Sequence, residues 1–245
     1  MNAQIFFSVN SGLYLYGSDT GILIDAIHAG YKEGYSDMPE KLLSDLYNGK
    51  GIFRYADGLL FTHLHPDHYD SDKAGRYIDN HHAISVYGPH CLQSNIQPIR
   101  TSAWTGTLRI GNLEIVVMKS VHDGVSDRQT PHVSFLVKVG QERILIPGDA
   151  DLMAEDGKIA KQLSSEQIDI MFGNYYQIFT ERGQNALRII SPERLVIYHL
   201  PFPNDDRYEY NEQARLSLKR YPKDLPNVEF VPHMSWVDGK NPPWL

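Results

Sequence analysis

The stretch Thr62–His68 constrains this chain more than any other feature, because it reads Thr-His-Leu-His-Pro-Asp-His and directly follows an apolar run. Side chains two residues apart on an extended chain point to the same side, so His63 and His65 can bind one cation together. The proline then bends the chain, and Asp67 and His68 face a neighbouring position that a second cation could occupy. Imidazole and carboxylate groups are the ligands that zinc and similar divalent ions prefer. A solvated histidine-rich loop is the alternative, but this spacing at a strand end favours half of a metal site.

Composition narrows the class of protein. The chain has 245 residues, a formal net charge of −7, eleven histidines and one cysteine, Cys91. A single cysteine excludes both an intrachain disulfide and a thiolate zinc site. The negative charge disfavours nucleic acid as a partner and leaves a small molecule as the expected substrate. Neither a leader-like segment nor an apolar run of about 18 residues occurs, so we expect a soluble, cytoplasmic protein with no membrane partner. The composition is also compatible with a homo-oligomer.

Apolar runs that alternate with turn residues indicate many strands and a few helices. Strands are predicted at 5–7, 13–16, 22–24, 58–62, 84–87, 108–110, 113–118, 133–137, 143–146, 168–172, 195–198 and 228–231. Helices are predicted at 37–48 with Asp37 as N-cap, at 72–80 with Ser71 as N-cap, and near 184–190 and 207–221. No linker or shift in composition divides the chain, so residues 1–245 are expected to form a single domain.

Three further residues of metal-ligand type share one feature, which is a position at the end of an apolar strand. His122 follows the strand at 113–118, Asp149 follows 143–146 in Pro-Gly-Asp, and His199 follows 195–198. Strand ends that meet at one edge of a sheet are where α/β enzymes carry their chemistry. We therefore expect these residues to complete the site that the histidine-rich loop begins.

Taken together, these motifs resemble the metallo-β-lactamase-fold hydrolase superfamily, whose members carry a His-x-His-x-Asp-His loop followed by a His, an Asp and a final His. The resemblance covers roughly residues 5–200. It implies an α/β fold with four αββα layers, in which two mixed sheets are flanked by helices and the metal site lies at one edge between the sheets. It also implies a role for each ligand. The first metal would be held by His63, His65 and His122, the second by Asp67, His68 and His199, with Asp149 bridging the two.

This ligand set implies a dinuclear metal-dependent hydrolase, with two zinc ions expected and manganese or iron as alternatives. Two ions about 3.5–4 Å apart can hold a bridging hydroxide that attacks an ester, lactone or phosphodiester bond. Asp67 would orient this hydroxide and accept its proton. Asp149 stands where common β-lactamases have Cys, and His65 where oxygen-reducing di-iron members have Glu. The lactonase and ribonuclease Z-like branch is the better match.

Two other enzyme classes compete with this prediction. A mononuclear iron persulfide dioxygenase-like oxidoreductase shares the loop but uses one iron. A ribonuclease Z-like nuclease shares the ligand set, but it usually carries an extended arm that this chain lacks. Substrate contacts are predicted at His132, Tyr175 and Tyr176, each of which also has a purely structural interpretation. Four other histidines are interpreted as surface or structural residues, namely His81, His82, His90 and His233.

Overall fold

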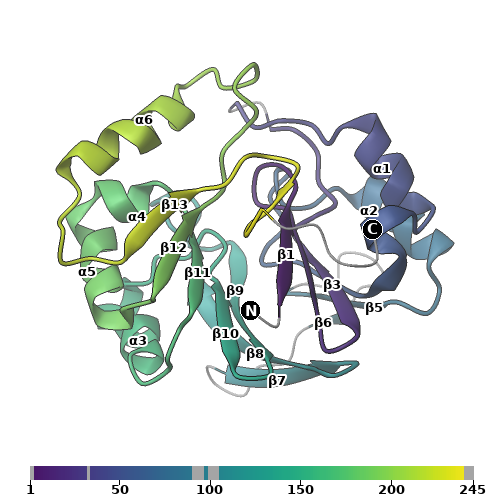
Figure 1. Cartoon of the computed structure of the whole chain (residues 1–245), viewed down its shortest axis with the longest axis horizontal. Helices are drawn as coiled ribbons and strands as arrows, with labels where there is room; N and C mark the ends of the chain where they lie inside the picture. Colours follow the sequence, from purple (N-terminus) through teal and green to yellow (C-terminus); the bar gives the residue numbers. More distant parts are fainter. Residues whose placement is uncertain (1–2, 32–33, 90–96, 99–104, 240–245) are drawn as a thin grey trace.

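The computed structural model describes residues 3–31, 34–89, 97–98 and 105–239. His90 and Cys91, on which two of the sequence interpretations rest, lie outside the described residues. Two seven-stranded sheets face each other, and helices cover the outer face of each, so that four layers follow one another across the molecule (Figure 1). This arrangement confirms the αββα prediction. Within the described residues, every helix is too short or too polar to cross a membrane.

The first sheet begins with the predicted meander and continues with parallel strands. Its strands lie in the order β14 (Ser235–Trp236), β1 (Gln4–Phe7), β2 (Leu13–Gly17), β3 (Thr20–Ile24), β4 (Ala56–Leu60), β5 (Ser85–Gly88) and β6 (Gln97–Pro98). Neighbouring strands from β14 to β3 are antiparallel, and those from β3 to β6 are parallel. The first sheet is therefore mixed, as the resemblance implied.

The second sheet is also mixed. Its order is β13 (Asn227–Phe230), β12 (Arg194–Ile197), β11 (Ile170–Gly173), β10 (Glu142–Ile146), β9 (Pro131–Val139), β8 (Leu113–Val121) and β7 (Thr105–Ile110). Because β9 is antiparallel to both β8 and β10, and β10 to β13 are mutually parallel, strands β8, β10, β11 and β12 all end at the same edge. The strand-end residues of the sequence analysis are therefore brought to one place.

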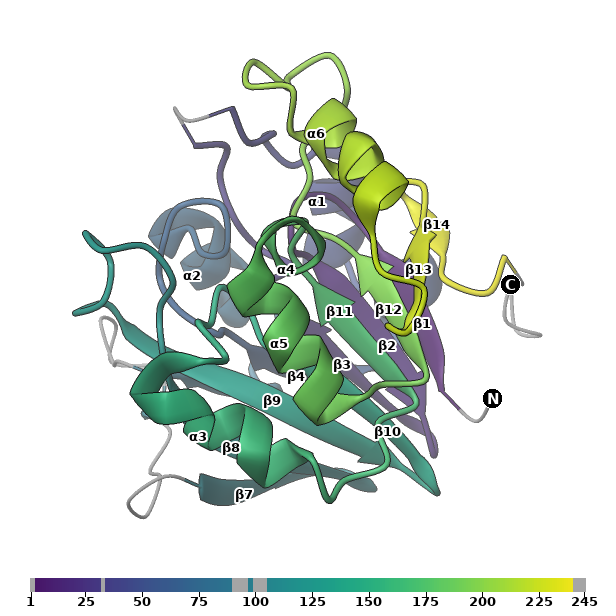
Figure 2. The ribbon, with the colours of Figure 1, turned by 90° about the vertical axis from the view of Figure 1, so that its left-hand side faces the viewer.

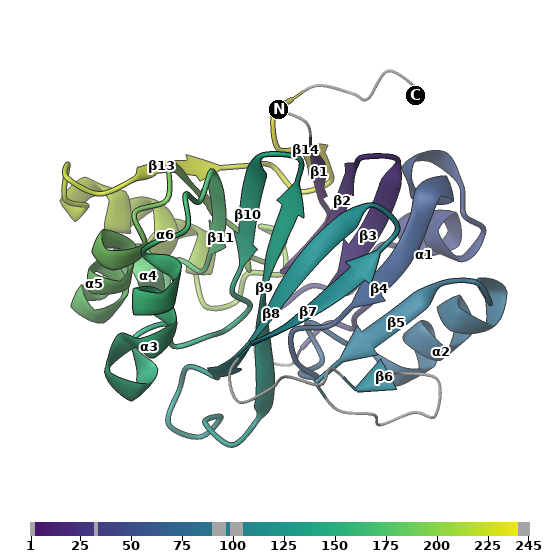
Figure 3. The same ribbon diagram turned by 90° about the horizontal axis from the view of Figure 1, so that it is seen from below.

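The helices bury one face each against the outer sides of the sheets. Helices α1 (Glu40–Tyr47) and α2 (Ser71–Asn80) cover the first sheet (Figure 3). The second sheet is covered by α3 (Ala154–Leu163), α4 (Tyr176–Phe179), α5 (Glu181–Ile190) and α6 (Tyr210–Ser217) (Figure 2). Two 3-10 helices, η1 (Gly51–Tyr55) and η2 (Leu218–Arg220), complete the described helices.

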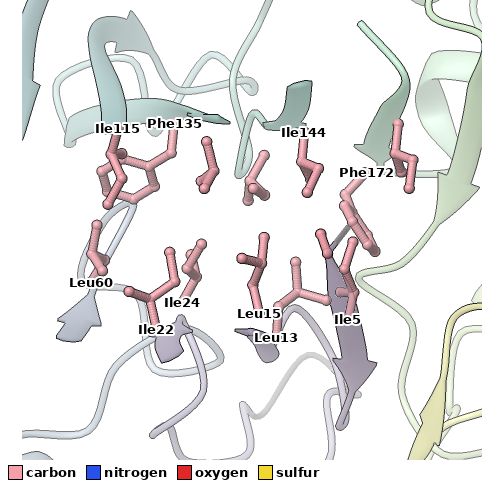
Figure 4. Close-up of a cluster of buried hydrophobic side chains, with 14 of the residues drawn as sticks. Ile5, Leu13, Leu15, Ile22, Ile24, Leu60, Ile115, Phe135, Ile144 and Phe172 are labelled. Atoms are coloured by element: carbon pink, nitrogen blue, oxygen red, sulfur yellow. The ribbon is translucent and has the colours of Figure 1, made fainter. Parts of the chain in front are cut away.

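The space between the sheets is filled by apolar side chains from both (Figure 4). Each labelled residue of this core is 3% exposed or less: Ile5, Leu13, Leu15, Ile22, Ile24, Leu60, Ile115, Phe135, Ile144 and Phe172. Fully burying such a side chain stabilises a fold by about 1.5–3 kcal/mol. The core thus makes a rigid base for the loops at the edge of the sheets.

Both predicted helix caps are wrong by one or two residues. Helix α1 begins after Pro39, and the Asp37 carboxylate instead accepts a hydrogen bond from the Gly30 backbone N–H at 2.7 Å. Helix α2 is capped by Asp70, whose side chain accepts from the Lys73 N–H at 2.8 Å, and Ser71 is already helical. An aspartate and a serine compete as N-cap residues, and local pattern alone does not decide between neighbours.

Two helices were not predicted, and one begins later than predicted. Helix α4 has only one turn. In α3 three successive residues, 155–157, have left-handed backbone angles, so its regular part is confined to 158–163, too short to show a full apolar repeat in the sequence. Helix α6 begins at Tyr210 rather than 207.

Candidate metal centre

The histidine-rich loop and the ends of β8, β10 and β12 meet at one edge of the two sheets. The loop follows β4 of the first sheet, while His122, Asp149 and His199 follow strands of the second sheet. The Val133 N–H donates to the Thr62 carbonyl at 2.9 Å, which joins the loop directly to β9 across the gap between the sheets. The site therefore lies where both sheets contribute, as the resemblance implied.

The seven predicted ligands form two groups. His63, His65 and His122 make the first, and Asp67, His68, Asp149 and His199 make the second, with the ligand atoms of each group within 4.8 Å of one another. Six of the seven residues are buried, and the His65 side chain is 28% exposed. The centre thus has its more open side at His65.

One carboxylate oxygen lies between the two groups. Asp149 Oδ2 is 3.7 Å from Nε2 of both His63 and His122, and 3.4 Å from Nε2 of both His68 and His199. Ligands that surround a zinc ion tetrahedrally at about 2.1 Å lie about 3.4 Å from one another. The donor spacing therefore fits metal ions of this size, and Asp149 is placed to contact an ion in either group.

Asp25 and Thr62 support one histidine from each group. The Asp25 carboxylate accepts from the Thr62 N–H at 2.8 Å, from the Thr62 hydroxyl at 2.6 Å and from His68 Nδ1 at 2.9 Å. The Thr62 oxygen is in turn 3.1 Å from His63 Nδ1. Both histidines are therefore oriented through Nδ1, which leaves Nε2 for a cation.

The other histidines have separate outer partners. His122 Nδ1 is 2.5 Å from the Asp123 carbonyl oxygen, and His199 Nδ1 is 3.0 Å from the Tyr35 hydroxyl. For His65 it is Nε2 that faces protein atoms, at 3.4 Å from the Thr130 hydroxyl. His65 is therefore left with Nδ1 for the first group.

Asp149 is held by two hydrogen bonds and by the tight turn before it. Its Oδ1 accepts from the Asn174 side-chain amide at 2.9 Å, and its backbone N–H donates to His132 Nε2 at 3.0 Å. Gly148 precedes it with a φ of 61°, and a Cβ there would lie 2.8 Å from Thr62 and 2.9 Å from His132. Only glycine fits this left-handed, closely packed position. The Pro-Gly-Asp sequence thus brings the carboxylate up to the histidines.

Burial and neighbouring charges shift the pKa values of the residues in this centre in opposite directions. Burial lowers the pKa of His63 well below its usual value. Burial would lower the pKa of His68 too, but the carboxylates of Asp149, Asp25 and Asp67 raise it well above its usual value. Burial would raise the pKa of Asp149, but His199 and His68 hold it well below its usual range. The metal-free centre thus keeps Asp149 ionised, in the state in which a carboxylate binds cations.

The three predicted substrate residues take different positions. His132 is 2% exposed, and both ring nitrogens have protein partners, since Nδ1 is 2.6 Å from the Ser120 hydroxyl. This geometry favours its structural interpretation. The Tyr176 hydroxyl donates to the Ala150 carbonyl at 3.4 Å, and Tyr176 lines a cavity of about 130 Å³ with Arg182. Tyr175 instead packs against Tyr210 of α6, at 5.8 Å between ring centroids.

The sequence did not predict four residues that lie within hydrogen-bond distance of the predicted ligands. Asp25 directly follows β3 and Thr62 begins the histidine-rich loop, and neither position by itself predicts a partner of a ligand. Asn174 follows β11 at the same edge as the ligands, so the strand-end rule could have found it. Tyr35 carries no such signal, because it lies in a loop 164 residues before His199.

The comparisons with known proteins agree with this architecture. No family model matches the sequence, and a search of curated proteins finds no match. Among solved structures, the metallo-β-lactamase fold protein YhfI from Bacillus subtilis is 13% identical, with 96% of this chain and 98% of that one covered at a TM-score of 0.64. Igni18, a metallo hydrolase from Ignicoccus hospitalis, is 17% identical, with 96% and 97% covered at a TM-score of 0.64.

A third similar structure has a different named activity. CmlA, a diiron β-hydroxylase from Streptomyces venezuelae, is 14% identical, and the match covers 95% of this chain but 53% of that one at a TM-score of 0.65. Identities this low establish the architecture rather than the reaction. This chain has the metallo-β-lactamase fold.

Proposed function

We propose that this protein is a dinuclear metal-dependent hydrolase that cleaves an ester, lactone or phosphodiester bond in a small molecule. The observation that carries the proposal is the position of Asp149 Oδ2, 3.4–3.7 Å from a ring nitrogen of two histidines in each group. A carboxylate shared by two sets of ligand-type side chains suits a pair of cations better than a single one.

The proposed ligand roles follow the two groups. His63, His65 and His122 would hold the first cation, and Asp67, His68 and His199 the second, with Asp149 between them. Imidazole-rich sites with carboxylates suit zinc, which we expect, and also manganese or iron. The buried, hydrogen-bonded outer partners support this assignment, because they fix each ring before a cation arrives.

Two bound cations would supply a water of lowered pKa and would polarise a substrate oxygen. Asp67 is the residue that we assign to this water. Its Oδ2 is 2.9 Å from His199 Nε2 and 3.7 Å from His68 Nε2, and the residue is 3% exposed. The carboxylate can therefore orient a water at the second group and accept its proton in a place from which bulk solvent is excluded. One of Tyr175 and Tyr176 is the proposed hydrogen-bond donor to the substrate.

The solved relatives support the general class and leave the metal to be decided. Igni18 is a metallo hydrolase, whereas CmlA is a diiron hydroxylase on the same fold. His65 stands where oxygen-reducing members have glutamate, which favours hydrolysis. A persulfide dioxygenase-like enzyme with one iron would leave the ligands of the second group without a role. The small-molecule substrate, the single domain of residues 1–245 and the cytoplasmic location likewise belong to this proposal.

Metal analysis followed by a substrate panel tests it. The purified protein should contain two zinc, manganese or iron ions per chain by elemental analysis, and His63→Ala should lose the first. His82→Ala is the matched control, since His82 is an exposed histidine away from both groups. The loaded protein should hydrolyse at least one of bis(p-nitrophenyl) phosphate, an aliphatic lactone or a thioester, and chelation should abolish this activity. One iron per chain, or hydrolysis that survives chelation, would contradict the proposal.

A further inference from the structure

We propose that Tyr35 is a positioning residue for the second metal group, and that it orients His199 through a hydrogen bond to Nδ1. The inference rests on the proposed function, since it takes His199 as a metal ligand. Tyr35 lies in the loop before α1, far from every motif of the site in sequence.

The His199 ring lies between a tyrosine and two carboxylates. Its Nδ1 is 3.0 Å from the Tyr35 hydroxyl, and its Nε2 is 2.9 Å from Asp67 Oδ2 and 3.4 Å from Asp149 Oδ2. The Tyr35 and His199 ring centroids are 4.5 Å apart with planes inclined at 46°. The tyrosine therefore contacts both the outer nitrogen and the ring of this ligand.

Proton placement gives this hydrogen bond a definite direction. When Nε2 offers its lone pair to a cation, Nδ1 must carry the ring hydrogen and needs an acceptor. The Tyr35 oxygen takes this role, as the Asp25 carboxylate does for His68 and the Asp123 carbonyl for His122. A phenol hydroxyl can accept a hydrogen bond as well as donate one, so this contact suits a ring that donates from Nδ1.

The backbone on both sides of this hydrogen bond is held by one residue. Asn10 is fully buried, and its side-chain oxygen accepts from the Ser36 N–H at 3.1 Å, next to Tyr35. Its carbonyl oxygen accepts from the His199 N–H at 2.7 Å. The two partners are therefore anchored to a common point, which is the arrangement expected of a preorganised contact.

Helix α6 supports the tyrosine from the other side. The Tyr35 ring stacks on Tyr210, at 5.6 Å between centroids and 21° between planes. This stack fixes the ring, while the hydroxyl alone makes the hydrogen bond to His199 Nδ1. Replacing Tyr35 with phenylalanine keeps the first interaction and removes the second, so the two roles can be separated.

The test is a calorimetric titration of metal-free protein with Zn²⁺. The native chain should show two binding steps, and His199→Ala should lose the second, which identifies it. Tyr35→Phe should bind the second ion about 10–100-fold more weakly, as is usual when an outer partner of a ligand is lost, and the first ion normally. The His199 Nδ1–H signal in ¹⁵N spectra of the zinc-loaded variant should also weaken through faster exchange. Tyr208→Phe is the control, because it removes a hydroxyl from the same tyrosine cluster without touching His199.

The outcomes separate this inference from the proposed function. Two normal steps in Tyr35→Phe would overturn the role of Tyr35 and leave the two-metal proposal intact. Equal weakening of both steps would overturn it too, since the contact reaches only His199. A native chain that binds fewer than two ions would refute both. Thermal unfolding in chelator shows whether the variant is folded, and Tyr210→Ala, which removes the stack but keeps the hydroxyl, should weaken the second step less than Tyr35→Phe.

Discussion

Replacing Asp25 with asparagine should lower the stability of the metal-free protein and weaken metal binding, chiefly in the second group. Asp25 is fully buried, and its carboxylate accepts three hydrogen bonds, two from Thr62 and one from His68 Nδ1. Asparagine has the same shape but only one accepting oxygen. One of the two oxygens that now accept is therefore replaced by an NH₂ group.

The size of the effect follows from where that NH₂ group lies. If it faces the Thr62 backbone N–H, two donors meet and the hydrogen bond is lost. If it faces His68, the ring must change tautomer, so that Nδ1 accepts and Nε2 carries the hydrogen and cannot bind a cation. Losing one hydrogen bond to a charged group costs about 1.5–3 kcal/mol. The affinity of the second group for zinc should fall by about 10–100-fold.

Two measurements on the same variant check this prediction. Urea unfolding in chelator gives the change in the free energy of unfolding, and a zinc titration gives the two affinities. Asp57→Asn is the matched control, because Asp57 is exposed and accepts from the Gly21 N–H at 3.0 Å, remote from the ligands. If Asp25→Asn changed stability and zinc affinity no more than Asp57→Asn does, the outer-partner reasoning would be refuted.

Two further predictions concern pH and the bridging carboxylate. Burial lowers the pKa of three fully buried histidines, while His68 has a raised pKa; the three are His28, His63 and His132. The three histidines with a lowered pKa stabilise the fold above pH 6.5, and this contribution is lost as the pH falls. His68, with its raised pKa, has the opposite dependence: its contribution is complete below pH 6.5 and is lost as the pH rises. Below pH 6.5 His68 is protonated in both the folded and the unfolded chain, so the other three histidines leave three extra protons on the unfolded chain. The stability of the metal-free protein should therefore fall by up to about 4.1 kcal/mol per pH unit below 6.5, which urea midpoints at pH 7 and 5.5 would show. A flat profile would contradict this. Asn174→Ala removes the partner of Asp149 Oδ1 and should weaken both zinc-binding steps about equally, by roughly 10-fold, whereas loss in one step alone would exclude a shared role for Asp149.

The ligand set could be predicted from the sequence because it obeys a simple local rule. His122, Asp149 and His199 each end an apolar strand, and such ends meet wherever the strands run the same way in one sheet. The predictions of Asp37 and Ser71 as helix caps were wrong, because the choice between neighbouring residues depends on small differences in local free energy. Helix α3 was not predicted because its left-handed start at residues 155–157 leaves only a short regular stretch.

The outer partners could not be predicted in the same way. Tyr35 and Asn10 carry no motif. Tyr35 lies in the loop before α1 and Asn10 in the connection between β1 and β2, and they contact His199 only because both segments pack against the end of β12. His132 was predicted from its nearness to His122 in sequence. Its position beneath the Asp149 backbone, with both nitrogens occupied, depends on the register of β9 against β8.

By itself, the sequence determined the metal-binding residue types, their division into an early loop and three strand ends, and the alternation of strands and helices. These follow from spacing along the chain and from the two-residue and 3.6-residue repeats of secondary structure. Only the tertiary structure decided that Asp149 Oδ2 lies between the two groups, and that Asp25, Thr62, Asn174 and Tyr35 each lie within hydrogen-bond distance of one of their members. The physical reason is that hydrogen bonds and ligand geometry act over about 3 Å, and contacts this short between residues far apart in the chain exist only after both sheets have packed on their common core.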